Sequence, residues 1–139
     1  DNLGFVFQDF KLIPEMTVMD NINILRLEGV DTSRAPELML RLGILEQQKK
    51  KVKHLSGGQK QRVAIVRALV KAPEIILADE PTGNLDTATG EMVLTLFQKL
   101  FRQNGTTLMI VSHDDDMPRH VDRTIRLSDG ALIGEGINA

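Results

Sequence analysis

A helix followed directly by an entirely apolar strand, between Ser56 and Ala78, limits what this chain can fold into more than any other feature. Ser56 has the side chain of a good helix N-cap, and the run Gln59–Val70 that follows contains neither glycine nor proline. Pro73 is a stop signal for the helix, and the continuous apolar run Ile75–Ala78 is typical of a strand buried on both faces of a parallel sheet. This order predicts an α/β fold in which helices flank a parallel sheet.

The start of this predicted helix has the chemistry of a phosphate site. Gly57 and Gly58 lack a Cβ atom, so a ligand or another backbone can approach closely. The N-terminus of a helix also presents unpaired N–H groups and the positive end of the helix dipole, which suit a phosphate. Eight lysine or arginine residues and no acidic residue lie between Lys49 and Lys71, which adds positive potential. An ordinary capped helix with a solvated basic face is the structural alternative, because glycine-rich turns are common.

Two carboxylates stand at the end of the predicted strand. Asp79 and Glu80 follow it directly, and open α/β sheets bind ligands beyond the carboxyl ends of their strands. Burying adjacent carboxylates without partners would be costly. A magnesium ion near Asp79 and a water molecule that needs Glu80 as its base would explain both residues. Many strands end in acidic residues at the protein surface, which leaves a structural alternative for this pair.

Together these segments resemble the ATP-binding-cassette (ABC) ATPases. Leu55–Gln59 reads Leu-Ser-Gly-Gly-Gln and is similar to the family signature, Ile75–Glu80 is similar to its Walker B strand, and Asn84–Asp86 is similar to its D-loop. The resemblance implies an α/β fold with a P-loop NTPase-like parallel sheet flanked by helices and an inserted α-helical subdomain that carries the signature. It implies ATP and Mg²⁺ as cofactors, with Glu80 as general base and Asp79 on the metal. The residues implied to contact ATP or the dimer interface around it are Leu55, Ser56, Gly57, Gly58, Gln59 and Asp86.

Two further strand ends carry residues that the family uses. Gln8 follows Leu3–Phe7, which is expected to be a short buried strand, and resembles the Q-loop glutamine, which implies an amide oxygen toward Mg²⁺. His113 follows the apolar strand Thr107–Val111 and resembles the H-switch histidine, which implies a catalytic contact with the γ-phosphate. Taken alone, Gln8 would be a polar residue that ends a strand, and a lone histidine in the place of His113 would be structural.

The region between these motifs is expected to be helical. Thr17 is a plausible N-cap for a helix over Val18–Leu27, and Ser33 or Thr32 is expected to cap a second helix with Pro36 in its first turn. The resemblance implies that a groove in this subdomain receives a helix of a membrane subunit. Met16, Met19 and Met39 are candidates to line the groove, although methionine more often fills a core.

The C-terminal third is expected to begin with a helix over Thr87–Arg102, for which Asp86 is the N-cap and Gly105 a C-terminal signal. The segments Ile125–Leu127 and Ala131–Ile133 predict a hairpin. Residues 134–139 are expected to form a loose tail.

The resemblance suggests a division into a Q-loop strand and loop (about 1–13), a helical subdomain with the signature (14–71), and a part with Walker B, D-loop and H-switch (72–139). A P-loop of the form Gly-x-x-x-x-Gly-Lys-Ser/Thr is absent, since no lysine is followed by serine or threonine. In an ABC domain this motif precedes the Q-loop strand, so the domain is expected to be incomplete at its N-terminus. We therefore expect these 139 residues alone to bind ATP weakly or not at all, and to associate through uncovered apolar surface.

Composition indicates which classes of partner and structure to expect. There is no cysteine for a disulfide framework, no apolar run long enough to span a bilayer, and a net charge of −2 that does not favour nucleic acid. The lysine run Lys49–Lys53 contains no aromatic residue and is expected to be a solvated loop. The resemblance implies a second ABC ATPase domain and a membrane-embedded permease as partners. It also implies a peripheral location at the cytoplasmic face of the cell (inner) membrane.

Within the family, the segments Phe7–Phe10 and Leu77–Asp86 resemble the branch that contains lipoprotein-release, macrolide-export and cell-division ATPases. Two alternatives stay open. One is a DNA-repair or chromosome ATPase, but those carry long coiled coils between Q-loop and signature, and Gln8 and Ser56 are here only 48 positions apart (56 − 8). The other is a non-catalytic interaction module without a P-loop.

Overall fold

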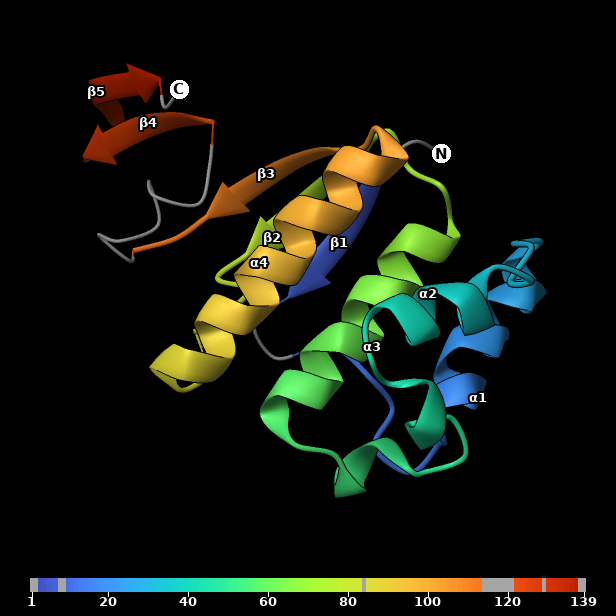
Figure 1. Cartoon of the computed structure of the whole chain (residues 1–139). Helices are drawn as coiled ribbons and strands as arrows, with labels where there is room; N and C mark the ends of the chain where they lie inside the picture. The colour runs from blue at the N-terminus through green and yellow to red at the C-terminus, as the bar shows by residue number, and fades with distance from the viewer. Residues whose placement is uncertain (1–2, 8–9, 84, 114–121, 129, 138–139) are drawn as a thin grey trace.

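The larger of the two described sheets is parallel and has three strands (Figure 1). The computed structural model describes residues 3–7, 10–83, 85–113, 122–128 and 130–137. The strand order is β1-β2-β3, and Phe7, Asp79 and Val111 lie opposite one another at the ends of the three strands. The strands are β1 (Leu3–Phe7), β2 (Ile75–Asp79) and β3 (Thr107–Val111).

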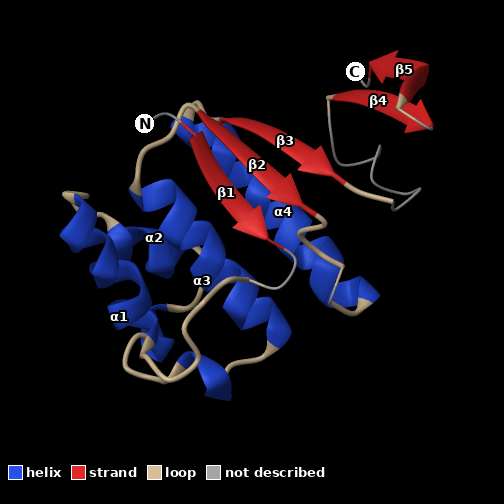
Figure 2. Cartoon of the chain, turned by 180° about the vertical axis from the view of Figure 1, so that it is seen from behind, coloured by secondary structure: helices blue, strands red, loops and turns tan. Residues whose placement is uncertain are grey.

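Helices cover one face of this sheet (Figure 2). The two long helices are α3 (Gly57–Val70) and α4 (Thr87–Asn104), and the core between them and the sheet includes Val6, Ile76 and Phe97, all 0% exposed. The expectations that β1 is buried and that β2 is buried on both faces are wrong for these 139 residues. Phe5 and Ile75 are each 43% exposed, while their neighbours Val6 and Ile76 are fully buried. The open face is apolar, as expected for uncovered sheet surface: it carries Leu3, Phe5, Ile75, Leu77, Met109 and Val111.

Short helices fill the segment between β1 and α3. The expected helix over Val18–Leu27 changes character partway: α1 (Val18–Asn23) is followed by the 3₁₀ helix η1 (Ile24–Glu28), which ends at Gly29 with a φ of 82°. Thr17 caps α1 as predicted, since its hydroxyl accepts from the Asp20 amide at 3.0 Å. The remaining elements here are α2 (Ala35–Arg41), η2 (Leu45–Gln47) and η3 (Val52–His54), and none of the described elements is a coiled-coil arm.

The structure corrects the predicted cap of α2 and decides between the two interpretations of Met39. Neither Ser33 nor Thr32 caps α2; Arg34 takes the N-cap position. The Thr32 hydroxyl instead donates to the Asn23 side chain at 2.9 Å and accepts from Arg26 at 2.8 Å, so it serves a polar cluster under η1. Met39 does not line a groove, because it is 0% exposed in the core.

Backbone hydrogen bonds join the two ends of this helical segment. Thr17 and Lys51 form an isolated antiparallel bridge. On either side of it, the Val18 amide donates to the Lys50 carbonyl at 2.9 Å and the Val52 amide donates to the Met16 carbonyl at 3.0 Å. The lysine side chains of this stretch are exposed, as predicted for a solvated loop.

In the C-terminal part, the predicted helix and hairpin are both present, and the hairpin strands are longer than predicted. Helix α4 ends at Gly105 in the left-handed region (φ 67°), and β4 (Arg123–Ser128) pairs antiparallel with β5 (Ala131–Ile137). The predicted loose tail is wrong up to Ile137, since the strand continues that far opposite Arg123. Within the described part of the chain, none of the helices has both the length and the apolar character needed to cross a membrane.

Candidate functional site

The carboxyl ends of the three parallel strands bring three of the predicted residues to one edge of the sheet. Asp79 is the last residue of β2 and is exposed. Glu80 follows with a φ of 45°, and its amide donates to the Val111 carbonyl on β3 at 2.8 Å. A left-handed glutamate costs on the order of 1–3 kcal/mol, and such strain is concentrated at functional sites. The turn therefore holds Glu80 in a conformation that it would not adopt in an unconstrained chain.

The carboxylate of Glu80 is anchored by the residues that follow β3. The amide of His113 donates to Glu80 Oε1 at 2.8 Å, and the Ser112 hydroxyl lies 3.5 Å from Oε2. The His113 Nε2 atom lies 3.7 Å from Oε1. The Glu80 side chain is 21% exposed and that of His113 is 98% exposed. One side of the carboxylate is thus fixed while the histidine next to it stays open to a ligand.

A magnesium ion fits the donor set at this edge. Asp79 supplies one exposed carboxylate, and Mg²⁺ in phosphate-transfer sites is held by one or two carboxylates together with water and substrate phosphates. Gln8 lies outside the described residues, although it follows Phe7, the register partner of Asp79. Over the described ranges, no group of three or more histidine, cysteine or acidic side chains is arranged to hold a metal ion by itself.

The signature segment begins α3 with a complete capping box. The Gln59 amide donates to Ser56 Oγ at 3.2 Å, and the Ser56 amide donates to Gln59 Oε1 at 3.0 Å. Helix geometry leaves the amides of Gly57 and Gly58 without an intrahelical acceptor. Ser56 is exposed and Gly57 is half-buried, whereas Leu55 and Gly58 are buried, so the accessible part of this helix end is Ser56 and Gly57. This arrangement fits a phosphate group.

Two contacts join the signature helix to the loop and helix after β2. A Cβ atom on Gly58 would lie 2.6 Å from the Cγ2 atom of Thr89, so only glycine allows α3 and α4 to approach this closely. One turn further along α3, the fully buried Gln61 donates through Nε2 to the carbonyl of Pro81, next to Glu80. The position of the signature is thereby linked to the position of the Glu80 turn.

Asp86 caps α4, as its structural interpretation predicts. Its Oδ1 accepts from the Thr89 amide at 2.9 Å. Hydrogen bonds from the Thr89 side chain and from the Thr89 amide lower the pKa of this exposed carboxyl below its ordinary value. The neighbouring Asn84 lies outside the described residues.

The lowered pKa predicts a pH-dependent effect of Asp86→Asn. Asparagine is an equally good N-cap, so the variant removes only the charge. The stabilisation by that charge is fully present above the unfolded-state value of about 3.8 and is lost as the pH falls through the lower folded-state value. Urea unfolding followed by circular dichroism should show the variant to be less stable at pH 7 and at pH 5. The difference in stability should begin to shrink below pH 3.8 and vanish once the pH is below the lower folded-state pKa, whereas a pH-independent difference would contradict this.

The structure brings Asp79, Glu80 and His113 together at the carboxyl edge of the sheet. The hydrogen-bond partner of Ser56 is Gln59, and in the described ranges no hydrogen bond joins residues 55–59 to Glu80 or His113. Sequence reasoning missed Gln61 and Ser112. Gln61 had a signal, because it falls on the apolar face of its helix with Ala64, Ile65 and Ala68. Ser112 had none beyond its place at a strand end.

Comparison with known proteins identifies the class. The family model described as "ABC transporter" matches residues 1–83. The chain therefore belongs to the ABC transporter family, and its parallel sheet with flanking helices is an ABC ATPase fold. Solved structures agree: it superposes on cbiO1 from Clostridium perfringens with a TM-score of 0.89, 29% identity and coverage of 98% of this chain and 57% of that one. The ATP-binding cassette MJ0796, solved as a dimer bound to ADP and Pi, gives a TM-score of 0.80 at 40% identity, covering 99% of this chain and 63% of that one.

Sequence relatives place the chain in the predicted branch. It is 43% identical over 138 residues to the ABC transporter ATP-binding protein YvrO of Bacillus subtilis, which covers 96% of this chain and 60% of that protein. It is 42% identical to the lipoprotein-releasing system ATP-binding protein LolD of Novosphingobium aromaticivorans, covering 95% of this chain and 61% of that protein. The macrolide export ATP-binding/permease protein MacB of Syntrophobacter fumaroxidans is 43% identical over 96% of this chain and 20% of its own length. The chain thus spans about 60% of the length of YvrO and LolD.

Proposed function

We propose that this chain is part of an ATP-hydrolysing subunit that drives a membrane transporter. The observation that carries the proposal is the Glu80 carboxylate, fixed by the His113 amide at the carboxyl edge of a parallel sheet and strained into a left-handed turn. A carboxylate in that place is suited to accept the proton of an attacking water. Membership of the ABC transporter family supports the choice of ATP as substrate.

In this proposal each residue at the sheet edge has one task. Glu80 is the general base, and the exposed His113 side chain contacts the γ-phosphate and stabilises the charge that develops there. Asp79 and Gln8 would hold Mg²⁺, whose charge would neutralise the phosphate oxygens. Phosphoryl transfer depends mainly on positioning and on charge stabilisation, and these groups supply both.

The signature segment, in this proposal, completes the site of a second copy. Within one copy, no hydrogen bond among described residues joins Ser56 to Glu80, which supports a site shared between two molecules. The Ser56 hydroxyl and the amides of Gly57 and Gly58 would close on the γ-phosphate held by the partner copy, with Leu55 and Gln59 fixing their positions. Asp86 would contact the partner across the same interface. The dimeric solved structure of MJ0796 supports this arrangement.

The remaining parts of the proposal concern organisation and partners. Residues 1–13 would form the Q-loop strand and loop, 14–71 the helical subdomain, and 72–139 the rest of the catalytic core. The membrane partner would be a permease, as the names of the relatives suggest, with this subunit held peripherally at the cytoplasmic face and without nucleic acid. Since the 139 residues contain no P-loop sequence, they alone should bind ATP weakly.

A complementation experiment tests the shared site. In the full-length protein, Glu80→Gln and Ser56→Arg should each abolish ATP hydrolysis. When the two inactive variants are mixed, unfolded and refolded together, random pairing should restore about a quarter of the wild-type rate, because half of the symmetric dimers become mixed and each mixed dimer has one intact site of two.

The controls separate the possible outcomes. Each variant refolded alone should stay inactive, and light scattering should show that each still forms ATP-dependent dimers in amounts that match its ATP binding. Recovery no greater than the sum of the two parents would contradict a shared site. A full-length wild-type protein that neither binds nor hydrolyses ATP would contradict the proposed function as a whole.

A further inference from the structure

Two consecutive non-glycine residues after β1 adopt the left-handed conformation. Phe10 has a φ of 66° and Lys11 a φ of 51°. A single residue of this kind is uncommon, because its Cβ atom is crowded by the backbone, and two in succession need an external hold. The turn lies directly downstream of residues 8 and 9, in the segment that the proposed function assigns to magnesium binding.

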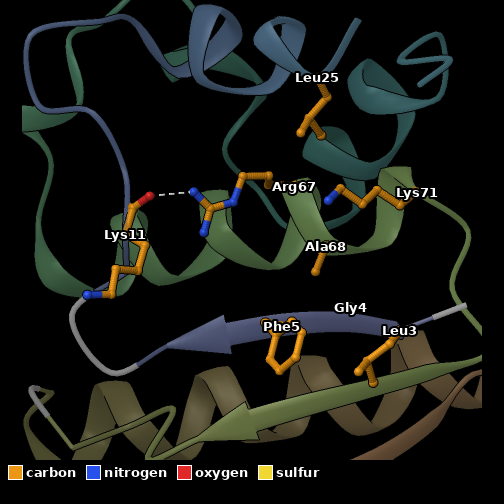
Figure 3. Close-up of a pocket in the computed structure, with 8 residues that line it drawn as sticks. All are labelled: Leu3, Gly4, Phe5, Lys11, Leu25, Arg67, Ala68 and Lys71. Carbon is orange, nitrogen blue, oxygen red and sulfur yellow. Dashed lines mark hydrogen bonds between the residues drawn. The ribbon is translucent and has the colours of Figure 1, made fainter. Parts of the chain in front are cut away.

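The hold comes from the signature helix. Arg67 on α3 donates through Nη1 to the Lys11 carbonyl at 2.6 Å and through Nη2 to the Phe10 carbonyl at 2.9 Å, and Figure 3 shows its guanidinium directed at Lys11. The two bonds use the planar fork of the guanidinium, which a lysine cannot reproduce. Burial lowers the pKa of Arg67 below its ordinary value. Hydrogen bonds from a charged donor in such a half-buried place are stronger than those between neutral groups.

Two cations of the signature helix and its C-cap line the same pocket, and Arg67 is the one bonded to the turn. Arg67 lines a pocket between β1 and α3 together with the apolar side chains of Phe5, Leu25 and Ala68 (Figure 3). Lys71, one turn further along α3, lines the same pocket, but its ammonium lies 3.9 Å from the Glu28 carboxylate. Replacing Lys71 therefore removes a positive charge from the pocket without removing the hydrogen bonds of Arg67 to the turn.

We propose that Arg67 is a positioning residue: it clamps the Phe10–Lys11 turn to the signature helix, and the proposed reaction depends on this clamp for its response to magnesium. The inference rests on the proposed function for its catalytic consequence, and on geometry alone for the clamp. Arg67 lies ten positions after Gly57 on the same helix (67 − 57). The clamp thus connects the signature helix to the turn after β1. In the proposed function, the start of that helix contacts the ATP of the partner copy, whereas the turn belongs to the site of its own copy.

Trypsin tests the clamp without reference to ATP. The peptide bond that trypsin would cut after Lys11 contains the carbonyl held by Arg67. In the full-length protein, Arg67→Gln should raise the rate of cleavage between Lys11 and Leu12 roughly tenfold or more, since proteolysis follows the open population and bonds to charged groups resist opening. Arg67→Lys, which keeps one bond at most, should give an intermediate rate, and the matched control Lys71→Gln should leave the rate unchanged.

The magnesium dependence of ATP hydrolysis tests the consequence. Arg67→Gln should raise the Mg²⁺ concentration needed for half-maximal activity several-fold, with Lys71→Gln unchanged. Adding Lys11→Asn to Arg67→Gln should bring the Mg²⁺ concentration for half-maximal activity most of the way back to the wild-type value. Asparagine adopts the left-handed conformation more readily than lysine. If Arg67→Gln does not fold, Arg67→Lys with and without Lys11→Asn carries the same comparison.

Several outcomes would overturn the inference. An unchanged cleavage rate in Arg67→Gln would show that there is no clamp. Faster cleavage with unchanged Mg²⁺ dependence, or a defect that Lys11→Asn does not relieve, would reduce Arg67 to a structural residue. If the wild-type protein hydrolyses no ATP, the proposed function fails while the trypsin comparison still decides whether the clamp exists.

Discussion

Replacing Glu80 with glutamine in the full-length protein will lower kcat for ATP hydrolysis by roughly 10²–10⁴-fold, the usual contribution of a general base. Glutamine has the same shape, and its Oε1 can still accept the hydrogen bond that the His113 amide donates at 2.8 Å. The variant therefore keeps the left-handed turn and loses only the ability to take up a proton. ATP affinity should change little, because the proposed phosphate and magnesium contacts come from other residues.

The measurement is steady-state phosphate release together with calorimetric ATP binding. Glu74→Gln is the matched control, since Glu74 is an exposed acidic residue just before the opposite end of β2, and this variant should hydrolyse ATP at the wild-type rate. A Glu80→Gln protein that retains more than about a tenth of wild-type kcat would remove the general-base role. A loss of ATP binding in the same variant would point instead to a structural role in the site.

Replacing Gly58 with alanine should lower the free energy of unfolding by up to about 2 kcal/mol. The new methyl group would lie 2.6 Å from Thr89 Cγ2, and overpacking of this kind costs about 1–3 kcal/mol. The gain in helix propensity from glycine to alanine, about 1 kcal/mol at most, offsets part of that cost. Chemical denaturation of Gly58→Ala and wild type measures the difference.

Thr89→Ser separates packing from function at this position. Serine lacks the Cγ2 methyl group that meets the new side chain, so Gly58→Ala with Thr89→Ser should regain most of the lost stability, while Thr89→Ser alone sets the baseline. If Gly58 also serves the phosphate of the partner copy, hydrolysis stays low in the stabilised double variant. Full recovery of both stability and activity would leave Gly58 with a packing role only.

The parts of the fold that sequence could predict are those whose signals are local. The strands Leu3–Phe7 and Thr107–Val111 match their predicted bounds because each is a short apolar run. The caps by Thr17 and Asp86 follow from side chains that reach only three residues along the chain. The proximity of Glu80 and His113 was also predictable, because parallel strands end at a common edge.

The rest depends on contacts between distant residues. The hydrogen bonds of Arg67 span 56 and 57 positions, and nothing in the local sequence marks Phe10 and Lys11 as left-handed. The change from α1 to a 3₁₀ helix at Ile24 leaves the apolar pattern nearly intact, so periodicity could not show it. The burial of β2 on one face only depends on which elements cover the sheet. The sequence of the strand itself cannot predict whether a second face is covered.

The bridge between Thr17 and Lys51 has a consequence for how the sequence can change. Because backbone hydrogen bonds join the two ends of the helical segment at Thr17 and Lys51, these ends can stay together when the number of residues between them changes. Chain length added within such a closed loop costs little, about 0.6 kcal/mol for each doubling. Residues can therefore be added at exposed turns of this segment, such as the one at Gly29, whereas the buried Met39 and Ile44 must stay apolar to fill the core.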